Sequence, residues 1–177
     1  MRTLVLGGIR SGKSRWAESA IAEHAGATEP VHYVATGAVR RGDAEWSARI
    51  AAHRARRPSH WRTVETTDIA AQLRTVAAPT LIDDVGGWLT AAMERTGAFE
   101  SGSVSTEVDD LVEAVRGFGA PLVLVSPEVG LSVVPATAAG RRFADELGAL
   151  NQRLAAVCEQ VTLVVAGQPI TVKGPQR

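Results

Sequence analysis

Five short runs of apolar residues, separated by longer stretches of mixed polarity, set the pattern of this chain. The runs are apolar almost throughout and do not alternate with polar residues, which is typical of parallel strands covered on both faces of a sheet. The predicted strands are Thr3–Leu6, Val31–Ala35, Thr80–Ile82, Leu122–Val125 and Val161–Ala166.

The stretches between these runs carry helical periodicity. It is clearest over residues 138–159, where the large apolar side chains fall on one helical face. Further helices are predicted over residues 15–23, 43–57, 85–93 and 104–117, and loops over residues 37–42 and 97–105. Strands that alternate with helices predict an α/β fold with a mostly parallel central sheet, in one domain that spans residues 1–177. The loops after the first four strands should then open on the same crevice.

A glycine-rich segment directly follows the first predicted strand and precedes the first predicted helix. It fits the pattern G-x-x-x-x-G-K-[ST] and consists of Gly7, Gly8, Ile9, Arg10, Ser11, Gly12, Lys13 and Ser14. In this context backbone N–H groups turn toward a phosphate, Lys13 reaches the outer phosphates, and the Ser14 hydroxyl binds Mg²⁺. The alternative is a glycine-rich turn that binds nothing, but the flanking strand and helix favour a nucleotide-binding loop. The predicted fold is therefore a three-layer sandwich similar to the P-loop NTPases.

The amino-acid composition argues against several classes of binding partner. The 177 residues carry 19 basic and 19 acidic side chains, so no excess of positive charge indicates a nucleic acid or an anionic membrane as partner. The single cysteine, Cys158, excludes an internal disulfide and is expected to pack in the core. No signal peptide and no apolar run long enough to cross a bilayer is recognisable, so we expect a soluble cytoplasmic protein with no membrane insertion.

Residues 43–65 are unusually rich in arginine, histidine and tryptophan. On a helix, Arg49, His53 and Arg57 recur at four-residue spacing and form a cationic face suited to an anion. Positive neighbours favour a neutral imidazole at His53, which could attack a nucleotide phosphorus and carry a phosphoramidate. The alternative is a solvated histidine on a charged helix, and for the pattern alone that is the more common case.

The order of motifs along the chain resembles the bifunctional adenosylcobinamide kinase / adenosylcobinamide-phosphate guanylyltransferase family. Besides the glycine-rich loop, the matching segments are Tyr33-Val34-Ala35-Thr36 and Arg49-Ile50-x-x-His53-Arg54-x-x-Arg57-Pro58-x-x-Trp61-x-Thr63-x-Glu65. Later matches are Glu128-Val129-Gly130, Val134-Pro135, Gly148-x-x-Asn151-Gln152-x-Leu154-Ala155 and Val165-Ala166-Gly167. The resemblance runs in order over residues 1–173, and it is the ordered set that is specific.

This resemblance implies two reactions in the assembly of the cobalamin nucleotide loop. One phosphorylates adenosylcobinamide. The other transfers GMP from GTP to adenosylcobinamide phosphate, which gives adenosylcobinamide-GDP and pyrophosphate. The resemblance also implies GTP as substrate, GTP or ATP for the kinase step, Mg²⁺ as cofactor, and a small homo-oligomer such as a trimer.

The resemblance also implies roles for particular residues. In the family the GMP passes through a guanylylated histidine, and the matching position is His53. Lys13 is expected to assist catalysis at the phosphates, and Ser14 and Asp83 are expected to bind Mg²⁺. The alternative for the adjacent residues Asp83 and Asp84 is that one of them caps the following helix. Outside the glycine-rich loop, the residues expected at the nucleotide are Ala35, Thr36, Gly37, Arg54, Ala55, Arg56, Arg57, Glu65 and Asp83.

Three positions depart from the family pattern. Gly86 stands where a threonine is usual, Pro127 where an asparagine is usual, and Ser132 where a second glycine is usual. Because these positions face the crevice, they bear on the corrinoid site and the kinase reaction more than on the nucleotide loop or His53. Two other functions therefore stay open: a small-molecule kinase or NTPase without a covalent histidine, and a nucleotide-binding regulatory protein with little turnover.

Overall fold

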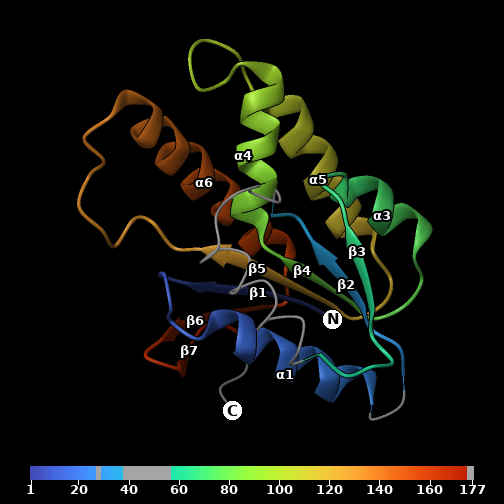
Figure 1. Ribbon diagram of the computed structural model, residues 1–177. Coiled ribbons are helices and arrows are strands. Elements are labelled where there is room, and N and C mark those ends of the chain that lie inside the picture. Colours follow the sequence, from blue (N-terminus) through green and yellow to red (C-terminus); the bar gives the residue numbers. More distant parts are fainter. Residues whose placement is uncertain (27–28, 38–56, 175–177) are drawn as a thin grey trace.

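The computed structural model describes residues 1–26, 29–37 and 57–174, which form a seven-stranded sheet with helices on both faces (Figure 1). The strands lie in the order β3-β2-β4-β5-β1-β6-β7. All neighbouring strands pair in parallel except β6 and β7, which form an antiparallel hairpin at one edge. The bounds are β1 (Arg2–Gly7), β2 (His32–Ala35), β3 (Arg62–Glu65), β4 (Thr80–Asp83), β5 (Leu122–Pro127), β6 (Gln160–Val165) and β7 (Gln168–Lys173).

Helix α1 (Lys13–Ala25) covers one face of the sheet, and the other described helices cover the opposite face (Figure 1). These are α3 (Ile69–Thr75), α4 (Val85–Thr96), α5 (Ser105–Gly117) and α6 (Ala138–Val157). The three-layer sandwich with a mostly parallel sheet is therefore confirmed. The helix predicted over residues 43–57 lies outside the described residues except for Arg57, which is not helical. Within the described part of the chain, every helix is too short or too polar to cross a bilayer.

Each predicted strand forms, and two further strands escaped prediction. The missed strands, β3 and β7, lie at the two edges of the sheet and are almost fully exposed. An edge strand in solvent has no buried face to show as an apolar run, and Pro169 further weakens the strand pattern in β7. The last predicted strand ends before Ala166 because Ala166 and Gly167 have positive φ angles (51° and 78°) and turn the chain into β7.

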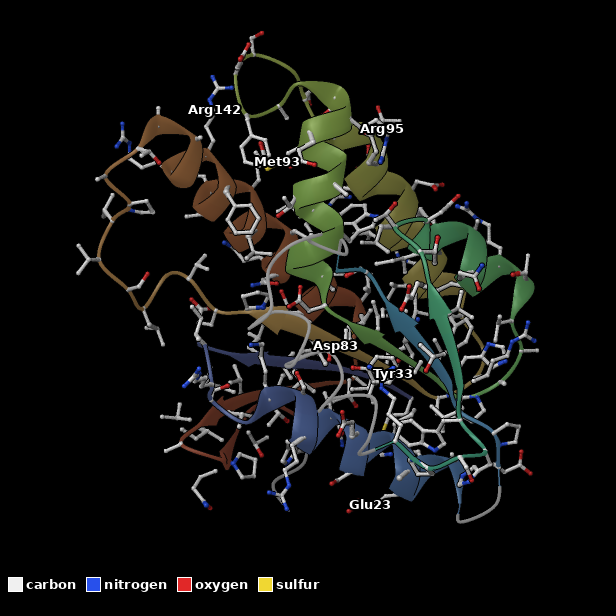
Figure 2. The ribbon with its side chains drawn as sticks, viewed as in Figure 1. Glu23, Tyr33, Asp83, Met93, Arg95 and Arg142 are labelled. Carbon is white, nitrogen blue, oxygen red and sulfur yellow. The ribbon has the colours of Figure 1, made fainter. Side chains whose placement is uncertain are left out.

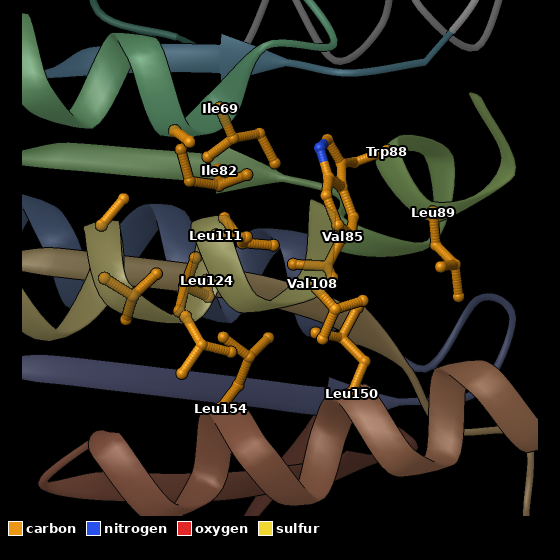
Figure 3. Packing of buried hydrophobic residues seen from close by; sticks show 14 of the residues in the cluster. Ile69, Ile82, Val85, Trp88, Leu89, Val108, Leu111, Leu124, Leu150 and Leu154 are labelled. Carbon is orange, nitrogen blue, oxygen red and sulfur yellow. The ribbon is translucent and has the colours of Figure 1, made fainter. Parts of the chain in front are cut away.

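The larger apolar core lies between the sheet and helices α3 to α6. Figure 3 shows Ile82 and Leu124 of the sheet in this cluster, together with Leu111 of α5 and Leu154 of α6. These side chains are fully buried. A second cluster lies between the sheet and α1 and includes Tyr33. Burial on both faces explains why the central strands are apolar throughout.

Arg2, at the start of β1, connects the sheet to the ends of two helices. Its Nε donates to Oε1 of Glu159 (3.0 Å), which follows α6, and its Nη1 donates to the carbonyls of Val115 (3.4 Å) and Arg116 in α5. The hydrogen bond from the Arg2 side chain is the main cause that lowers the pKa of Glu159 from its usual 4.5 to about 2. This ion pair should therefore make stability depend on pH.

We expect Glu159→Gln to lower the free energy of unfolding near neutral pH and to have less effect in acid. The folded-state pKa of Glu159 lies below the unfolded value, so the pair stabilises fully above about pH 4.5 and progressively less toward about pH 2. Because the Glu159 side chain is 46% exposed, solvent screening limits the contribution to about 0.5–1 kcal/mol. Urea unfolding of both proteins between about pH 6 and 3 measures the difference. A difference that stays constant over this range would contradict the prediction.

Candidate active site

The glycine-rich segment forms a compact loop between β1 and α1. Gly12 begins the helix with a left-handed backbone (φ 94°), and the amide of Trp16 donates to the Gly12 carbonyl (3.0 Å). Lys13 Nζ donates to the carbonyl of Gly8 (3.3 Å), so its ammonium group lies over the loop. Backbone amides and an ammonium group thus gather at the positive end of a helix, an arrangement that binds phosphate.

The turn between β6 and β7 supports this loop, a contact that the sequence pattern did not predict. The amide of Gly167 donates to the carbonyl of Ser11 (2.7 Å), and a Cβ atom on Gly12 would lie 3.1 Å from the Gly167 Cα. A Cβ atom on Gly7 would lie 2.8 Å from the carbonyl oxygen of Val164. The absence of side chains at Gly7 and Gly12 therefore lets β6 and its turn approach the loop closely. The only sequence signal for this contact is the resemblance of the segment around Gly167.

Ser14 and Asp83 meet beside the loop. Ser14, in the first turn of α1, donates from Oγ to Oδ1 of Asp83 (3.3 Å) at the end of β4. A hydroxyl and a carboxylate are hard oxygen donors, and Mg²⁺ is commonly held by one or two carboxylates together with substrate phosphates and water. The pair therefore fits Mg²⁺. The described residues contain no group of three or more histidine, cysteine or acidic side chains that could hold a metal ion without substrate.

Asp84 has a different structural role from Asp83. Its Oδ1 accepts a hydrogen bond from the amide of Gly87 (2.7 Å), so Asp84 caps the start of α4. The Thr36 hydroxyl donates to the Asp84 carbonyl and accepts from the Asp84 amide (3.1 Å), which ties the end of β2 to this helix start. Burial, and then the charge of Asp83, raise the pKa of Asp84. Each of the two expected roles therefore falls to a different residue of the pair: Asp84 caps the helix, and Asp83 faces Ser14.

Tyr33 of β2 belongs to the site, although sequence reasoning named it only as part of a motif. It is 1% exposed, and its hydroxyl donates to Oδ2 of Asp83; Figure 2 shows the two side chains together between the sheet and α1. The Arg57 guanidinium lies over the tyrosine ring, with Cζ 3.4 Å from the ring centre. Burial, followed by the charge of Asp83, raises the pKa of Tyr33 far above its usual value, so the phenol stays a donor.

Parallel pairing brings the carboxyl ends of β2, β3 and β4 side by side. Ala35 of β2 pairs with Asp83 of β4 on one side and with Glu65 of β3 on the other. Thr36 and Gly37 follow Ala35, and the glycine-rich loop follows the carboxyl end of β1 on the same side of the sheet. Four expected site residues lie outside the described residues: His53, Arg54, Ala55 and Arg56. Their roles stay predictions.

Two of the three departures from the family pattern touch each other. A Cβ atom on Gly86, in the first turn of α4, would lie 2.8 Å from Cγ and 3.0 Å from Cδ of Pro127 at the end of β5. Asn151 of α6 holds this strand end, since its Nδ2 donates to the Pro127 carbonyl (3.0 Å) and its Oδ1 accepts from the Ser126 hydroxyl (2.6 Å). The rigid proline ring therefore occupies the space that a side chain at position 86 would need.

Gly86→Ala is expected to destabilise the protein by about 1–2 kcal/mol, even though alanine is the better helix former. The clash with Pro127 costs about 1–3 kcal/mol by overpacking, whereas the gain in helix propensity is about 0.5–1 kcal/mol. Gly148→Ala in α6 is the matched control, because no atom lies within 4 Å of its Cβ position, and it should stabilise. Urea unfolding measures both variants. Removing the ring with Pro127→Ala should make Gly86→Ala much less harmful, and equal effects in both backgrounds would contradict the account.

The sequence matches a family model and curated proteins over nearly its full length. The family model described as "Cobinamide kinase / cobinamide phosphate guanyltransferase" matches residues 3–172. The bifunctional adenosylcobalamin biosynthesis protein CobP of Pseudomonas aeruginosa is 44% identical over 178 residues, which cover 98% of each chain. The bifunctional adenosylcobalamin biosynthesis protein CobU of Salmonella typhimurium is 38% identical over 194 residues, which cover 98% of this chain and 100% of that protein.

Solved structures support the fold assignment. An ATPase from the type III secretion system of pathogenic bacteria superposes with a TM-score of 0.59 and 16% identity. The match covers 96% of this chain and 56% of that ATPase. At this level of identity the likeness shows the fold alone, which is a three-layer sandwich with a mostly parallel sheet.

Proposed function

This chain belongs to the cobinamide kinase / cobinamide phosphate guanyltransferase family, and on this premise we propose that it carries both reactions through one P-loop site and a covalent histidine. It is a kinase and nucleotidyltransferase of cobalamin biosynthesis. In the proposed sequence it phosphorylates adenosylcobinamide, takes GMP from GTP onto His53, and passes GMP to adenosylcobinamide phosphate. The product is adenosylcobinamide-GDP.

The observation that carries the nucleotide part of this proposal is the meeting of Ser14 and Asp83 beside the glycine-rich loop. Ser14 Oγ lies 3.3 Å from Asp83 Oδ1, and Lys13 Nζ lies over the same loop. These groups supply two hard oxygen donors, one ammonium group and the amides of a helix start to one triphosphate. Bound Mg²⁺ would neutralise phosphate charge there, with Ser14 and Asp83 as its protein ligands.

In the transfer reaction, the neutral imidazole of His53 attacks the α-phosphorus of GTP. A phosphorus–nitrogen bond forms, and the bond to the β-phosphate oxygen breaks to release pyrophosphate. Lys13 and the loop amides stabilise the charge that develops on this leaving group. A phosphate oxygen of adenosylcobinamide phosphate then attacks the same phosphorus, the phosphorus–nitrogen bond breaks, and His53 is restored. Arg54 and Arg57 are proposed to hold phosphate oxygens during these steps.

In the kinase reaction, the same loop holds a nucleotide whose γ-phosphate is transferred to the hydroxyl of adenosylcobinamide. The loop contacts phosphates and not bases, so the loop itself does not select between GTP and ATP for this step. The remaining site residues proposed to contact nucleotide are Ala35, Thr36, Gly37, Ala55, Arg56 and Glu65. We further propose a small homo-oligomer in the cytoplasm, in keeping with the family resemblance.

Intact-mass spectrometry after incubation with GTP and Mg²⁺ tests the covalent step. The wild-type chain should gain the mass of one GMP, and His53→Ala should gain none. His60→Ala is the matched control, since His60 is an exposed histidine in the same arginine-rich region, and it should be guanylylated like the wild type. A wild-type protein that binds GTP but gains no mass would leave a kinase or a nucleotide-binding regulatory protein in place of the covalent transferase.

A further inference from the structure

A continuous row of contacts leads from the glycine-rich loop through Asp83 and Tyr33 to Arg57, which lies over the Tyr33 ring. Ser14 donates to Oδ1 of Asp83 (3.3 Å), and Tyr33 donates to Oδ2 of the same carboxylate. Arg57 stacks on the Tyr33 ring at 3.4 Å and donates from Nη1 to the Thr63 hydroxyl (3.0 Å). Each group in the row thus fixes the next one by a directional contact.

The Tyr33 side chain has little freedom to leave this arrangement. It is 1% exposed and belongs to the apolar cluster between the sheet and α1. Trp61 packs beside the ring, with centres 6.5 Å apart, and the Arg57 guanidinium covers a face of it. A buried phenol held on these sides presents its hydroxyl to Asp83 in one orientation.

We propose that Tyr33 is a positioning residue that fixes the Asp83 carboxylate, and that Arg57 acts on the site through Tyr33. With Oδ2 occupied by the phenol, Oδ1 is the oxygen turned toward Ser14. The inference rests on the proposed function, because it takes Asp83 as a ligand of the nucleotide-bound Mg²⁺. Tyr33 and Arg57 would thus influence Mg²⁺ binding indirectly, without contact with the metal ion.

Arg57 therefore has a role besides the phosphate contact expected from the sequence. Its guanidinium is already engaged by the Tyr33 ring and the Thr63 hydroxyl. Cation–π stacking pins the ring, and the ring carries the hydroxyl that holds Asp83. The loss of Arg57 should then matter less once that hydroxyl is gone.

The first test compares Tyr33→Phe with wild type in GTP binding at increasing Mg²⁺ concentration. The variant keeps the ring and its stacking and loses the hydroxyl alone. The Mg²⁺ concentration for half-maximal binding should rise about 10-fold, because partners that orient a metal ligand contribute about that much to metal affinity. Binding of GTP with excess EDTA should match wild type. Thr80→Val is the matched control: it removes a buried hydroxyl that donates to Ala78 (2.9 Å) at the opposite end of β4, and its Mg²⁺ requirement should equal that of wild type.

The second test is a double-mutant cycle with Arg57→Met. Alone, this variant should raise the Mg²⁺ requirement a few-fold, and in the Tyr33→Phe background it should add nothing further. Additive effects on the Mg²⁺ requirement would show that Arg57 acts on the metal site by a route other than Tyr33 and would overturn its proposed link to Tyr33. If wild type needs Mg²⁺ and Tyr33→Phe needs no more of it, the role of Tyr33 is wrong while the proposed function stands. If wild-type GTP binding ignores Mg²⁺ altogether, the metal role of Asp83 fails, and this inference fails with it.

Discussion

Lys13→Met is expected to lower kcat/KM at least about 100-fold in both the kinase and the guanylyl-transfer reactions. The ammonium group of Lys13 lies over the glycine-rich loop, where we propose that both reactions develop the charge of a leaving phosphate group. Methionine keeps the unbranched apolar part of the side chain and removes the charged ammonium group. Because the hydrogen bond from Lys13 to the Gly8 carbonyl is exposed, its loss leaves no buried group unpaired, and the melting temperature should stay close to that of wild type. Initial rates with each corrinoid substrate, together with thermal unfolding, measure the two effects.

Arg15→Met is the matched control for this loss of charge. Arg15 lies in the same first turn of α1 and its side chain is exposed. Water and salt screen an exposed cation that lies outside the glycine-rich segment, so rates should stay within about threefold of wild type. If Lys13→Met kept more than a tenth of wild-type activity, the loop would not be the site where the phosphate charge is stabilised.

The parts of this fold that the sequence predicts are those whose physical cause is local. The central strands are buried on both faces, so each can be recognised from its own apolar run without knowledge of the rest of the chain. The same holds for the glycine-rich loop, whose pattern is contained in residues 7–14 and in the strand and helix at its two ends. Strands β3 and β7 lacked such a signal because they lie exposed at the sheet edges.

The site shows the same division between local and distant causes. The sequence pointed to Ser14 and Asp83 because each belongs to a recognisable segment, and the structure brings the two side chains within hydrogen-bonding distance. The contact of Tyr33 with Asp83 and the support of the loop by Gly167 depend on strand order, which brings together residues far apart in the chain. The contact between Gly86 and Pro127 also depends on the tertiary structure. In the sequence they are two separate departures from the family pattern, and only the packing shows that the proline ring fills the space beside the glycine.

The adjacent aspartates provide the sharpest separation of a site residue from a structural one. Asp83→Asn is expected to lower kcat about 100-fold in both reactions, since a neutral amide is a poor ligand for Mg²⁺. The variant should fold normally, because asparagine keeps the shape of the side chain and an oxygen that can still accept a hydrogen bond from Tyr33 or Ser14. Steady-state rates across a range of Mg²⁺ concentrations, with the unfolding free energy measured in parallel, check both statements.

Asp84→Asn is expected to do the opposite: activity and stability should both stay near wild type. Asparagine caps a helix as well as aspartate does, and its side-chain oxygen can keep the hydrogen bond from Gly87. Burial already raises the pKa of Asp84, so replacing a costly buried charge with an amide has little penalty. Asp84→Ala removes the cap and should lower the unfolding free energy by about 1–2 kcal/mol. A loss of Mg²⁺-dependent activity in Asp84→Asn greater than that in Asp83→Asn would mean that the metal ligand and the helix cap have been assigned to the wrong members of the pair.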